Sequence, residues 1–220
     1  MQRCPEPELM NASDQVIAYA EADFSAGDQS VLEGLLSLID SSCVTLPPAS
    51  LILDLGCGPG NISERLASCW PLSDVIGIDG ASSMISMANQ RLFTRKPAIQ
   101  NLKYQHIDLS HCSLDDLQQI KGASVIVSNS LLHHLHNPQT LWDAVKQLAA
   151  PNAFILHRDL RRPSNEQEVD ALCDRYGSGA PAVLQRDFRA SLLAAFTAVE
   201  VSDQLVLAGL SQFTVKEIGD

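Results

Sequence analysis

The chain of 220 residues has no apolar run long enough to span a bilayer, although 45% of its residues are hydrophobic. A membrane-spanning helix needs about 20 predominantly apolar residues. The first eight residues contain no apolar targeting segment, so we expect a cytoplasmic location and no membrane partner. The length suits one domain with a large core, and we expect residues 1–220 to form that single domain.

Paired cysteines and an excess of basic residues are also missing. The six cysteines show no C-x-x-C spacing, which argues against a zinc site or a disulfide framework and favours reduced thiols. Lys and Arg total 15 against 26 Asp and Glu, so the formal net charge is −11. Proteins that bind nucleic acids neutralise phosphates with Lys and Arg, so we expect no nucleic-acid partner.

Residues 51–61 carry the most informative motif of the chain, L-I-L-D-L-G-C-G-P-G-N. An apolar strand ends near Asp54, and Gly56, Gly58 and Gly60 follow at every second position. Glycine lets the backbone turn tightly and lie against a ligand. The helix that follows offers unpaired N–H groups and a positive dipole end, which suits a nucleoside-type cofactor with a carboxylate. The alternative is a tight turn in which the glycines serve geometry only.

The glycine spacing distinguishes two kinds of cofactor. Dinucleotide-binding loops have the pattern G-x-G-x-x-G, whereas this loop reads G-x-G-x-G, one residue shorter. Asp54 would repel a pyrophosphate, but it can accept hydrogen bonds from an ammonium group, directly or through water. The spacing therefore disfavours a nicotinamide-dependent oxidoreductase.

Strand and helix patterns alternate along the chain. Apolar strands are predicted at 51–55, 74–78, 102–107, 123–128, 153–157 and 211–218. Helical patterns precede the first strand and separate the later ones, which predicts an α/β fold with a doubly wound, mostly parallel sheet. In such a sheet, ligands gather at the carboxyl ends of the strands.

The polar residues that follow these strands fit an adenosine-containing ligand. Asp79, after the second strand, can accept hydrogen bonds from both ribose hydroxyls, as it would in a nicotinamide enzyme. Asp108 can accept the adenine amino group, and the N–H of Leu109 can donate to a ring nitrogen. Asn129 and Ser130 follow the fourth strand.

Four features over about residues 51–159 together resemble those of class I S-adenosylmethionine-dependent methyltransferases. They are the motifs D-L-G-C-G-P-G and I-G-I-D, a third acid after a strand, and the motif S-N-x-x-L-H-H-L. The set is most similar to the small-molecule branch that includes ubiquinone and menaquinone biosynthesis methyltransferases. The resemblance implies a Rossmann-like sheet of six or seven strands and methyl transfer to a small-molecule acceptor, with release of S-adenosylhomocysteine. It implies a cofactor site formed by Tyr19, Asp54, Gly56, Cys57, Gly58, Gly60, Asp79, Gly80, Met84, Asp108, Leu109, Asn129, Ser130 and His134.

The resemblance also implies that helices within residues 1–46 form a lid, with Tyr19 and Phe24 over the cofactor; ordinary core packing is the alternative. Residues 160–196 are predicted to be a helical insertion that covers the acceptor. Arginines are frequent around it, and they either form surface ion pairs or meet an anionic group of the acceptor. The apolar N-terminal helices could pack on a second copy of the chain, so a homodimer is one expectation.

The histidines of the segment H-H-x-H are the candidates for acid–base chemistry. His133 and His136 have the i, i+3 spacing of a shared face, but no acid or cysteine stands at a fitting distance in sequence, so we predict no metal. His134 is expected beside the cofactor's sulfur. A base is needed only if the acceptor loses a proton, and the candidate catalytic residues are His133, His157 and Asp159. Packing is the alternative for the histidines, and a hydrogen-bonded strand end is the alternative for residues 157–159.

Two features of the C-terminal part are local. Thr197 and Glu200 form a capping-box pattern, and Gly209 suits the left-handed position after the helix that they begin.

A protein that binds the cofactor without catalysing a reaction, in a regulatory or scaffolding role, remains the alternative function.

Overall fold

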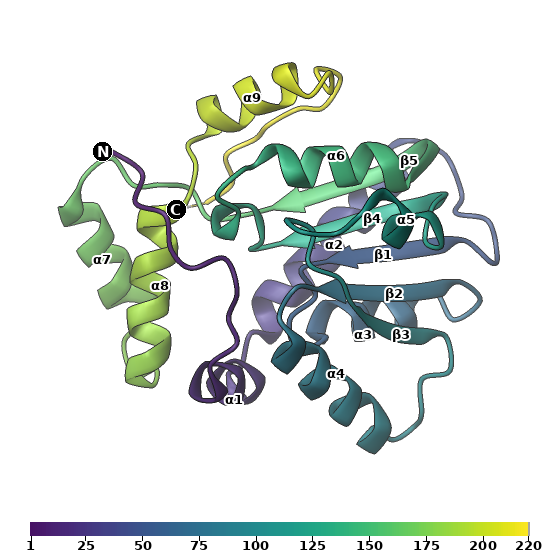
Figure 1. The fold of residues 1–220 in the computed structure, drawn as a ribbon, viewed down its shortest axis with the longest axis horizontal. Helices are drawn as coiled ribbons and strands as arrows, with labels where there is room; N and C mark the ends of the chain where they lie inside the picture. The colour runs from purple at the N-terminus through teal and green to yellow at the C-terminus, as the bar shows by residue number, and fades with distance from the viewer. Residues whose placement is uncertain (220) are drawn as a thin grey trace.

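The computed structural model describes residues 1–219, apart from the side chains of residues 114 and 115. Its centre is a parallel sheet of five strands in the order β3-β2-β1-β4-β5 (Figure 1). The strands are β1 (Leu51–Leu55), β2 (Asp74–Asp79), β3 (Leu102–His106), β4 (Ala123–Asn129) and β5 (Ala149–Arg158). All of the pairings are parallel, which confirms the predicted α/β class.

Helices cover both faces of this sheet. The helices are α1 (Ser13–Glu21), α2 (Ser25–Ser41), α3 (Asn61–Cys69), α4 (Ser82–Thr94), α5 (Leu114–Gln118), α6 (Gln139–Leu148), α7 (Glu166–Tyr176), α8 (Ala182–Ala194) and α9 (Ala198–Leu207), with a short 3-10 helix, η1 (Leu132–His134). No helix within residues 1–219 combines the length and the apolar character that crossing a membrane requires.

Two cores follow from the alternation of side chains along the strands. In β1, Ile52 packs in the core formed with α2, α3 and α4, whereas Leu53 and Leu55 pack in the core formed with α5, α6 and α9. Successive residues of a strand point to opposite faces, so a strand that is buried on both faces is apolar almost throughout. Figure 1 shows α1, α7 and α8 beyond the carboxyl ends of the strands, at the edge where a ligand site is expected.

The expected strand count was wrong. The structure shows five strands rather than six or seven, and residues 211–218 form none. Phe213 and Val215 pack against the core, so the alternating pattern that predicted a strand does reflect burial. A strand also needs a neighbour for its backbone hydrogen bonds. Among the described residues, β5 pairs only with β4, so one edge of the sheet has no further strand.

The predicted capping box at the start of α9 and the left-handed glycine after it are confirmed. The Thr197 hydroxyl accepts the N–H of Glu200, and the Glu200 side chain accepts the N–H of Thr197, which completes the capping box. Gly209 has φ +71°, and the N–H of Leu210 donates to the Leu205 carbonyl, as in a Schellman motif.

Candidate active site

A cavity of about 1280 Å³ lies at the carboxyl ends of the strands. Ligand pockets for small molecules commonly measure about 300–1,000 Å³, so this cavity has room for a cofactor together with a small acceptor. Twelve of the predicted cofactor residues line it: Tyr19, Gly56, Cys57, Gly58, Asp79, Gly80, Met84, Asp108, Leu109, Asn129, Ser130 and His134. The structure therefore brings together residues that the sequence places on five separate segments.

The glycine loop after β1 forms one wall of the cavity, and its glycines differ in what surrounds them. Gly56, Gly58 and Gly60 have φ values of +71°, +53° and +91°, which side chains rarely tolerate. A Cβ on Gly58 would meet nothing within 4 Å, so the backbone there is open to a ligand. A Cβ on Gly60 would lie 2.0 Å from the Tyr104 hydroxyl. Gly60 thus serves internal packing and does not line the cavity.

Asp54 lies behind this wall rather than in it. Its side chain is 1% exposed and accepts a hydrogen bond of 2.6 Å from the Ser63 hydroxyl. Burial raises the pKa of Asp54 to about 7, and the hydrogen bond from Ser63 only partly offsets that effect. The Asp54 side chain is therefore only partly ionised at neutral pH, and its ionised form carries a negative charge close beneath the glycine loop.

Asp79 closes the loop from β2. Its two carboxylate oxygens accept the backbone N–H groups of Gly58 at 2.8 Å and Ala81 at 2.7 Å. Each carboxylate oxygen can accept more than one hydrogen bond, so both keep a free position. Asp79 lines the cavity, and those positions suit a pair of adjacent hydroxyls.

Residues at the ends of β3 and β4 also line the cavity. Asp108 accepts the N–H of Ser110 and contacts the His111 ring, both at 2.9 Å. Ser130 has φ +54°, an unusual value for a residue with a side chain, and its N–H donates to the Arg158 carbonyl. Strained backbone of this kind concentrates at functional sites. Asn129 donates to the Ser130 hydroxyl at 3.2 Å.

The N-terminal residues cover the cavity from the side of α1. The rings of Tyr19 and Phe24 lie 5.4 Å apart, and both residues line the cavity. Burial raises the pKa of Tyr19 to about 12, so its hydroxyl stays protonated. The Leu9 side chain lies against the backbone of Gly80, where a Cβ would meet it at 2.8 Å.

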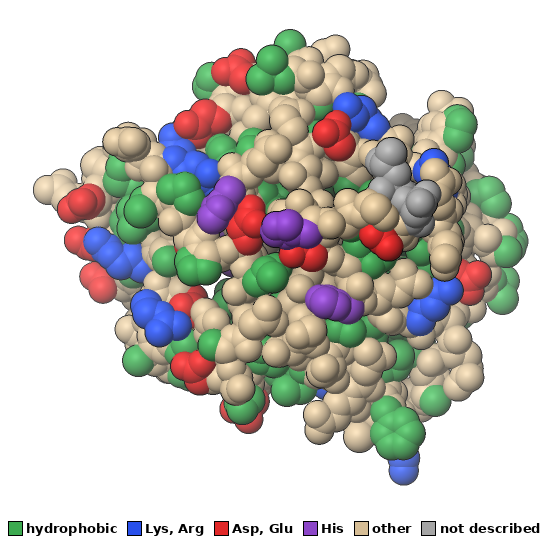
Figure 2. Space-filling view, viewed as in Figure 1, with side chains coloured by type: hydrophobic (Ala, Val, Ile, Leu, Met, Phe, Trp, Pro, Cys, Tyr) green, Lys and Arg blue, Asp and Glu red, His purple; other side chains and the backbone are tan. Residues whose placement is uncertain are grey.

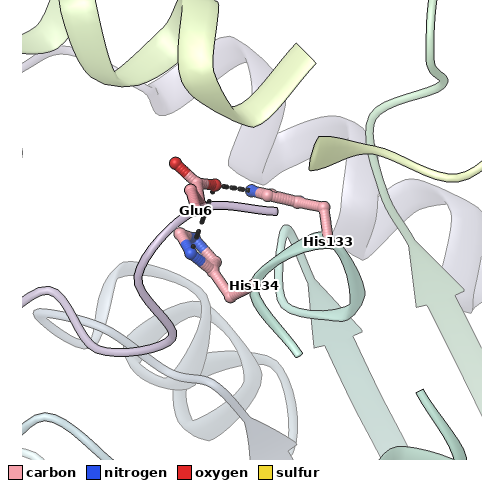
Figure 3. Close-up of side chains that lie close together, drawn as sticks. All are labelled: Glu6, His133 and His134. Carbon is pink, nitrogen blue, oxygen red and sulfur yellow. Dashed lines mark ion pairs between the residues drawn. The ribbon is translucent and has the colours of Figure 1, made fainter. Parts of the chain in front are cut away.

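The histidines after β4 meet two carboxylates, Asp159 and Glu6, and Figure 3 shows Glu6 between His133 and His134. His133, which is 2% exposed, makes a short contact through Nδ1 with Asp159, whose other oxygen accepts the N–H of Leu132 at 2.7 Å. The Glu6 carboxylate lies 3.5 Å from Nε2 of His133 and 3.3 Å from Nδ1 of His134. Figure 2 shows histidine and acidic side chains side by side near the middle of the same face.

The ionisation of this group follows from burial and close charges. Burial alone would raise the pKa of Asp159, but His133 outweighs it and holds the pKa at about 2. Burial lowers the pKa of His134 to about 4, assisted by the neighbouring His133. His157 packs edge-on against Trp142, and neither of its ring nitrogens has a hydrogen-bond partner among the described residues. Burial lowers the pKa of His157 too.

Most of the arginines near the insertion form ion pairs. Arg161 pairs with Glu217, Arg162 with Glu200, Arg186 with Asp187 and Arg189 with Asp170. Arg158 lines the cavity and has no ion pair within the part of the chain that the structure describes.

Sequence reasoning missed two residues of the N-terminal segment. Glu6 reaches the histidines, as described above. Arg3 donates to the carbonyls of His133 at 2.8 Å and Leu135 at 3.1 Å, and its guanidinium stacks over Phe196 at 4.0 Å. Charged residues in an irregular segment carry no spacing signal, so only the fold could bring them to this site.

Comparisons with known proteins find similarity to methyltransferases. Residues 53–155 match the family model described as "Methyltransferase domain". Trans-aconitate 2-methyltransferase of Variovorax paradoxus is 27% identical over 125 residues, which cover 57% of this chain and 43% of that protein. Malonyl-[acyl-carrier protein] O-methyltransferase of Bacillus cytotoxicus is 30% identical over 130 residues, which cover 54% and 42%. The matched region thus spans less than half the length of these relatives.

The fold is that of a methyltransferase. The plantazolicin methyltransferase BpumL, solved with a pentazolic desmethylPZN analogue and S-adenosylhomocysteine, superposes with a TM-score of 0.64 at 19% identity, over 89% of this chain and 69% of that one. The comparisons therefore agree with the predicted methyltransferase class and S-adenosylmethionine cofactor. These relatives do not carry the name of a quinone-biosynthesis enzyme, so resemblance to that branch stays a prediction.

Proposed function

We propose that this protein transfers a methyl group from S-adenosylmethionine to an oxygen of a small, carboxylate-bearing acceptor. One observation carries the cofactor assignment. Asp79 accepts the N–H groups of Gly58 and Ala81 and lines the cavity. The hydrogen bond to Gly58 holds Asp79, an acid that suits ribose hydroxyls, beside the open backbone of the glycine loop.

The remaining predicted cofactor residues receive roles by their position. We propose that Asp108 and Leu109 contact the adenine, and that Asn129, Ser130 and His134 line the methionine side. The negative charge of Asp54 favours the ammonium group of the methionine from behind the loop, through Ser63 or water rather than by direct contact. Gly60 supports the loop by packing on Tyr104 and does not touch the cofactor.

The acceptor is proposed to be anionic. The two relatives are named for trans-aconitate and for malonyl-[acyl-carrier protein], which both bear carboxylates. In this chain, Arg158 lines the cavity without an acidic partner among the described residues. A guanidinium recognises a carboxylate through two parallel hydrogen bonds. We therefore assign Arg158 to the acceptor's carboxylate.

The chemistry needs little from the protein beyond alignment. When bound, S-adenosylmethionine supplies an electrophilic methyl group, and an acceptor oxygen forms the new bond to carbon while the carbon–sulfur electron pair stays on sulfur. Carboxylic acids have pKa values near 4, so a carboxylate acceptor has already lost its proton at neutral pH and requires no base. The enclosing residues hold the two partners in line and exclude water.

This requirement changes the roles of the predicted catalytic residues. We propose that His133 and His157 take no proton from the acceptor, and that Asp159 positions His133 through Nδ1. The lid of residues 1–46 and the insertion of residues 160–196 are proposed to cover the cofactor and the acceptor, because both regions contribute residues to the cavity lining.

Calorimetric titration with S-adenosylhomocysteine tests the cofactor assignment. We expect micromolar binding by the wild type and loss of binding in Asp79→Ala. Asp74→Ala is the matched control, because Asp74 is an exposed acid at the opposite end of the same strand. Absence of binding by folded wild-type protein, or displacement of the ligand by NAD, would refute the proposal. A screen of carboxylate acceptors with labelled cofactor then separates an enzyme from a binding protein.

A further inference from the structure

Glu6 belongs to the segment before α1 and His133 and His134 to η1, and the three side chains place one ligand atom each within 4.8 Å of one another (Figure 3). We propose that this trio binds one divalent transition-metal ion of the zinc type. The proposal does not depend on the methyltransferase assignment, because it concerns only the donor atoms and their surroundings.

The two distances from Glu6 to the histidines fit a tetrahedral ion. Oε1 of Glu6 lies 3.5 Å from Nε2 of His133 and 3.3 Å from Nδ1 of His134, and all three donor atoms lie within 4.8 Å of one another. Zinc binds histidine nitrogen and carboxylate oxygen at about 2.0–2.2 Å, so two ligands of a tetrahedral zinc lie roughly 3.3–3.5 Å apart. Two imidazoles and one carboxylate leave a fourth position for water or a substrate oxygen.

The hydrogen bonds around the two rings leave lone pairs facing Glu6. The Pro7 backbone hydrogen-bonds the His134 ring, and a carbonyl can only accept, so that bond uses the ring's N–H. Nδ1 of His134 is then a bare acceptor; it is buried and has no hydrogen-bond partner among the described residues. It faces a carboxylate oxygen at 3.3 Å, which is unfavourable unless a cation lies between them.

His133 is oriented as metal-binding histidines usually are. Its Nδ1 is engaged by Asp159, which leaves Nε2 directed at Glu6. A carboxylate that holds the second nitrogen of a ligand histidine is the common arrangement at metal sites. The backbone N–H groups of Leu132 and His133 fix Asp159, and the Ser191 hydroxyl donates to Glu6 at 3.0 Å. The three ligand groups are thus held in place before any ion binds.

The site has an accessible side. His133, His134 and Ser191 all line the large cavity, so the fourth position faces it. The opposite side is closed by the N-terminal segment, where the backbone N–H of His136 donates to the Glu8 carboxylate at 2.7 Å and the His136 ring contacts the Glu6 carbonyl at 2.8 Å. A bound ion would therefore fasten this segment across the cavity.

The test is direct binding to protein freed of metal by a chelator. Zinc titrated calorimetrically, with metal content measured by mass spectrometry, should show one high-affinity ion per chain. Glu6→Gln should weaken zinc binding at least tenfold. Glu8→Gln is the matched control, because Glu8 is on the same segment and contacts His136 rather than the trio. Cobalt, which reports its ligands by absorption, should give a tetrahedral spectrum without thiolate bands.

Several outcomes would overturn the inference. They are absence of zinc binding by folded wild-type protein, equal affinity in Glu6→Gln and wild type, an equal loss in Glu8→Gln, or a cobalt–thiolate spectrum that places the ion on cysteines. In the first case a proton, and not a metal, bridges Glu6 and the histidines. Circular dichroism of each variant checks its folding. Binding of S-adenosylhomocysteine is measured separately, so failure of the metal site and failure of the proposed function are distinguishable.

Discussion

Replacing the buried acid Asp54 tests the electrostatics beneath the glycine loop. In Asp54→Asn the amide oxygen can still accept the hydrogen bond from Ser63, while the negative charge is removed. Burial raises the pKa of this carboxyl from 3.8 to about 7. One pH unit of pKa shift corresponds to about 1.4 kcal/mol, so ionising Asp54 in the folded protein costs on the order of 4 kcal/mol at pH values above 7.

The direction of the pH effect on stability follows from the difference in the pKa of Asp54 between the folded and unfolded states. A carboxyl whose pKa is raised on folding holds its proton more tightly in the folded state, so it destabilises the fold once it ionises. The cost is absent below the unfolded pKa near 3.8, grows as the pH rises toward 7 and is constant above that. The stability gained by Asp54→Asn should therefore be about 2–3 kcal/mol larger at pH 8 than at pH 5.

Denaturant unfolding of both proteins at these two pH values measures the effect. Asp74→Asn removes an exposed carboxylate from the start of β2 and should show no such pH dependence. Equal stability differences at pH 5 and pH 8 would refute the claim that Asp54 is a strained buried charge. The ammonium of a bound cofactor should offset the cost, so S-adenosylhomocysteine should stabilise the wild type more than Asp54→Asn at pH 8.

Two further predictions concern packing and the acceptor. Gly60→Ala should destabilise the fold in denaturant unfolding by about 1–2 kcal/mol more than Gly122→Ala, because both glycines have positive φ but only Gly60 abuts Tyr104. Equal losses would contradict the packing role. Arg158→Ala should raise KM for a carboxylate acceptor at least tenfold and leave cofactor affinity unchanged, whereas Arg189→Ala, which removes a partner of Asp170, should leave both near wild type. Unchanged KM in Arg158→Ala would exclude it from acceptor binding.

The grouping of residues at the carboxyl edge of the sheet was largely predictable, because these residues follow the strands directly; their contacts with a cofactor stay a prediction. Gly58, Asp79 and Asp108 occupy positions set by the βα alternation, and parallel strands bring their carboxyl ends to one edge. The capping box at Thr197 is equally local, because it depends only on a residue and its third neighbour.

Predictions that required a distant partner failed or stayed incomplete. The 211–218 segment has the alternation of a strand, yet forms none within the described chain, because backbone pairing depends on a neighbouring edge. The role of Gly60 was assigned to the cofactor, but the Tyr104 side chain, from β3, decides it.

The sequence by itself determined the class of the fold, the order of its βα units and the acids that line the cavity after β2 and β3, because hydrophobic period and local turn chemistry act over a few residues. Only the tertiary structure decided that Glu6 meets His133 and His134, and that Arg158 remains without an ion pair among the described residues. Contacts between distant segments depend on how whole elements pack, and no spacing along the chain encodes them.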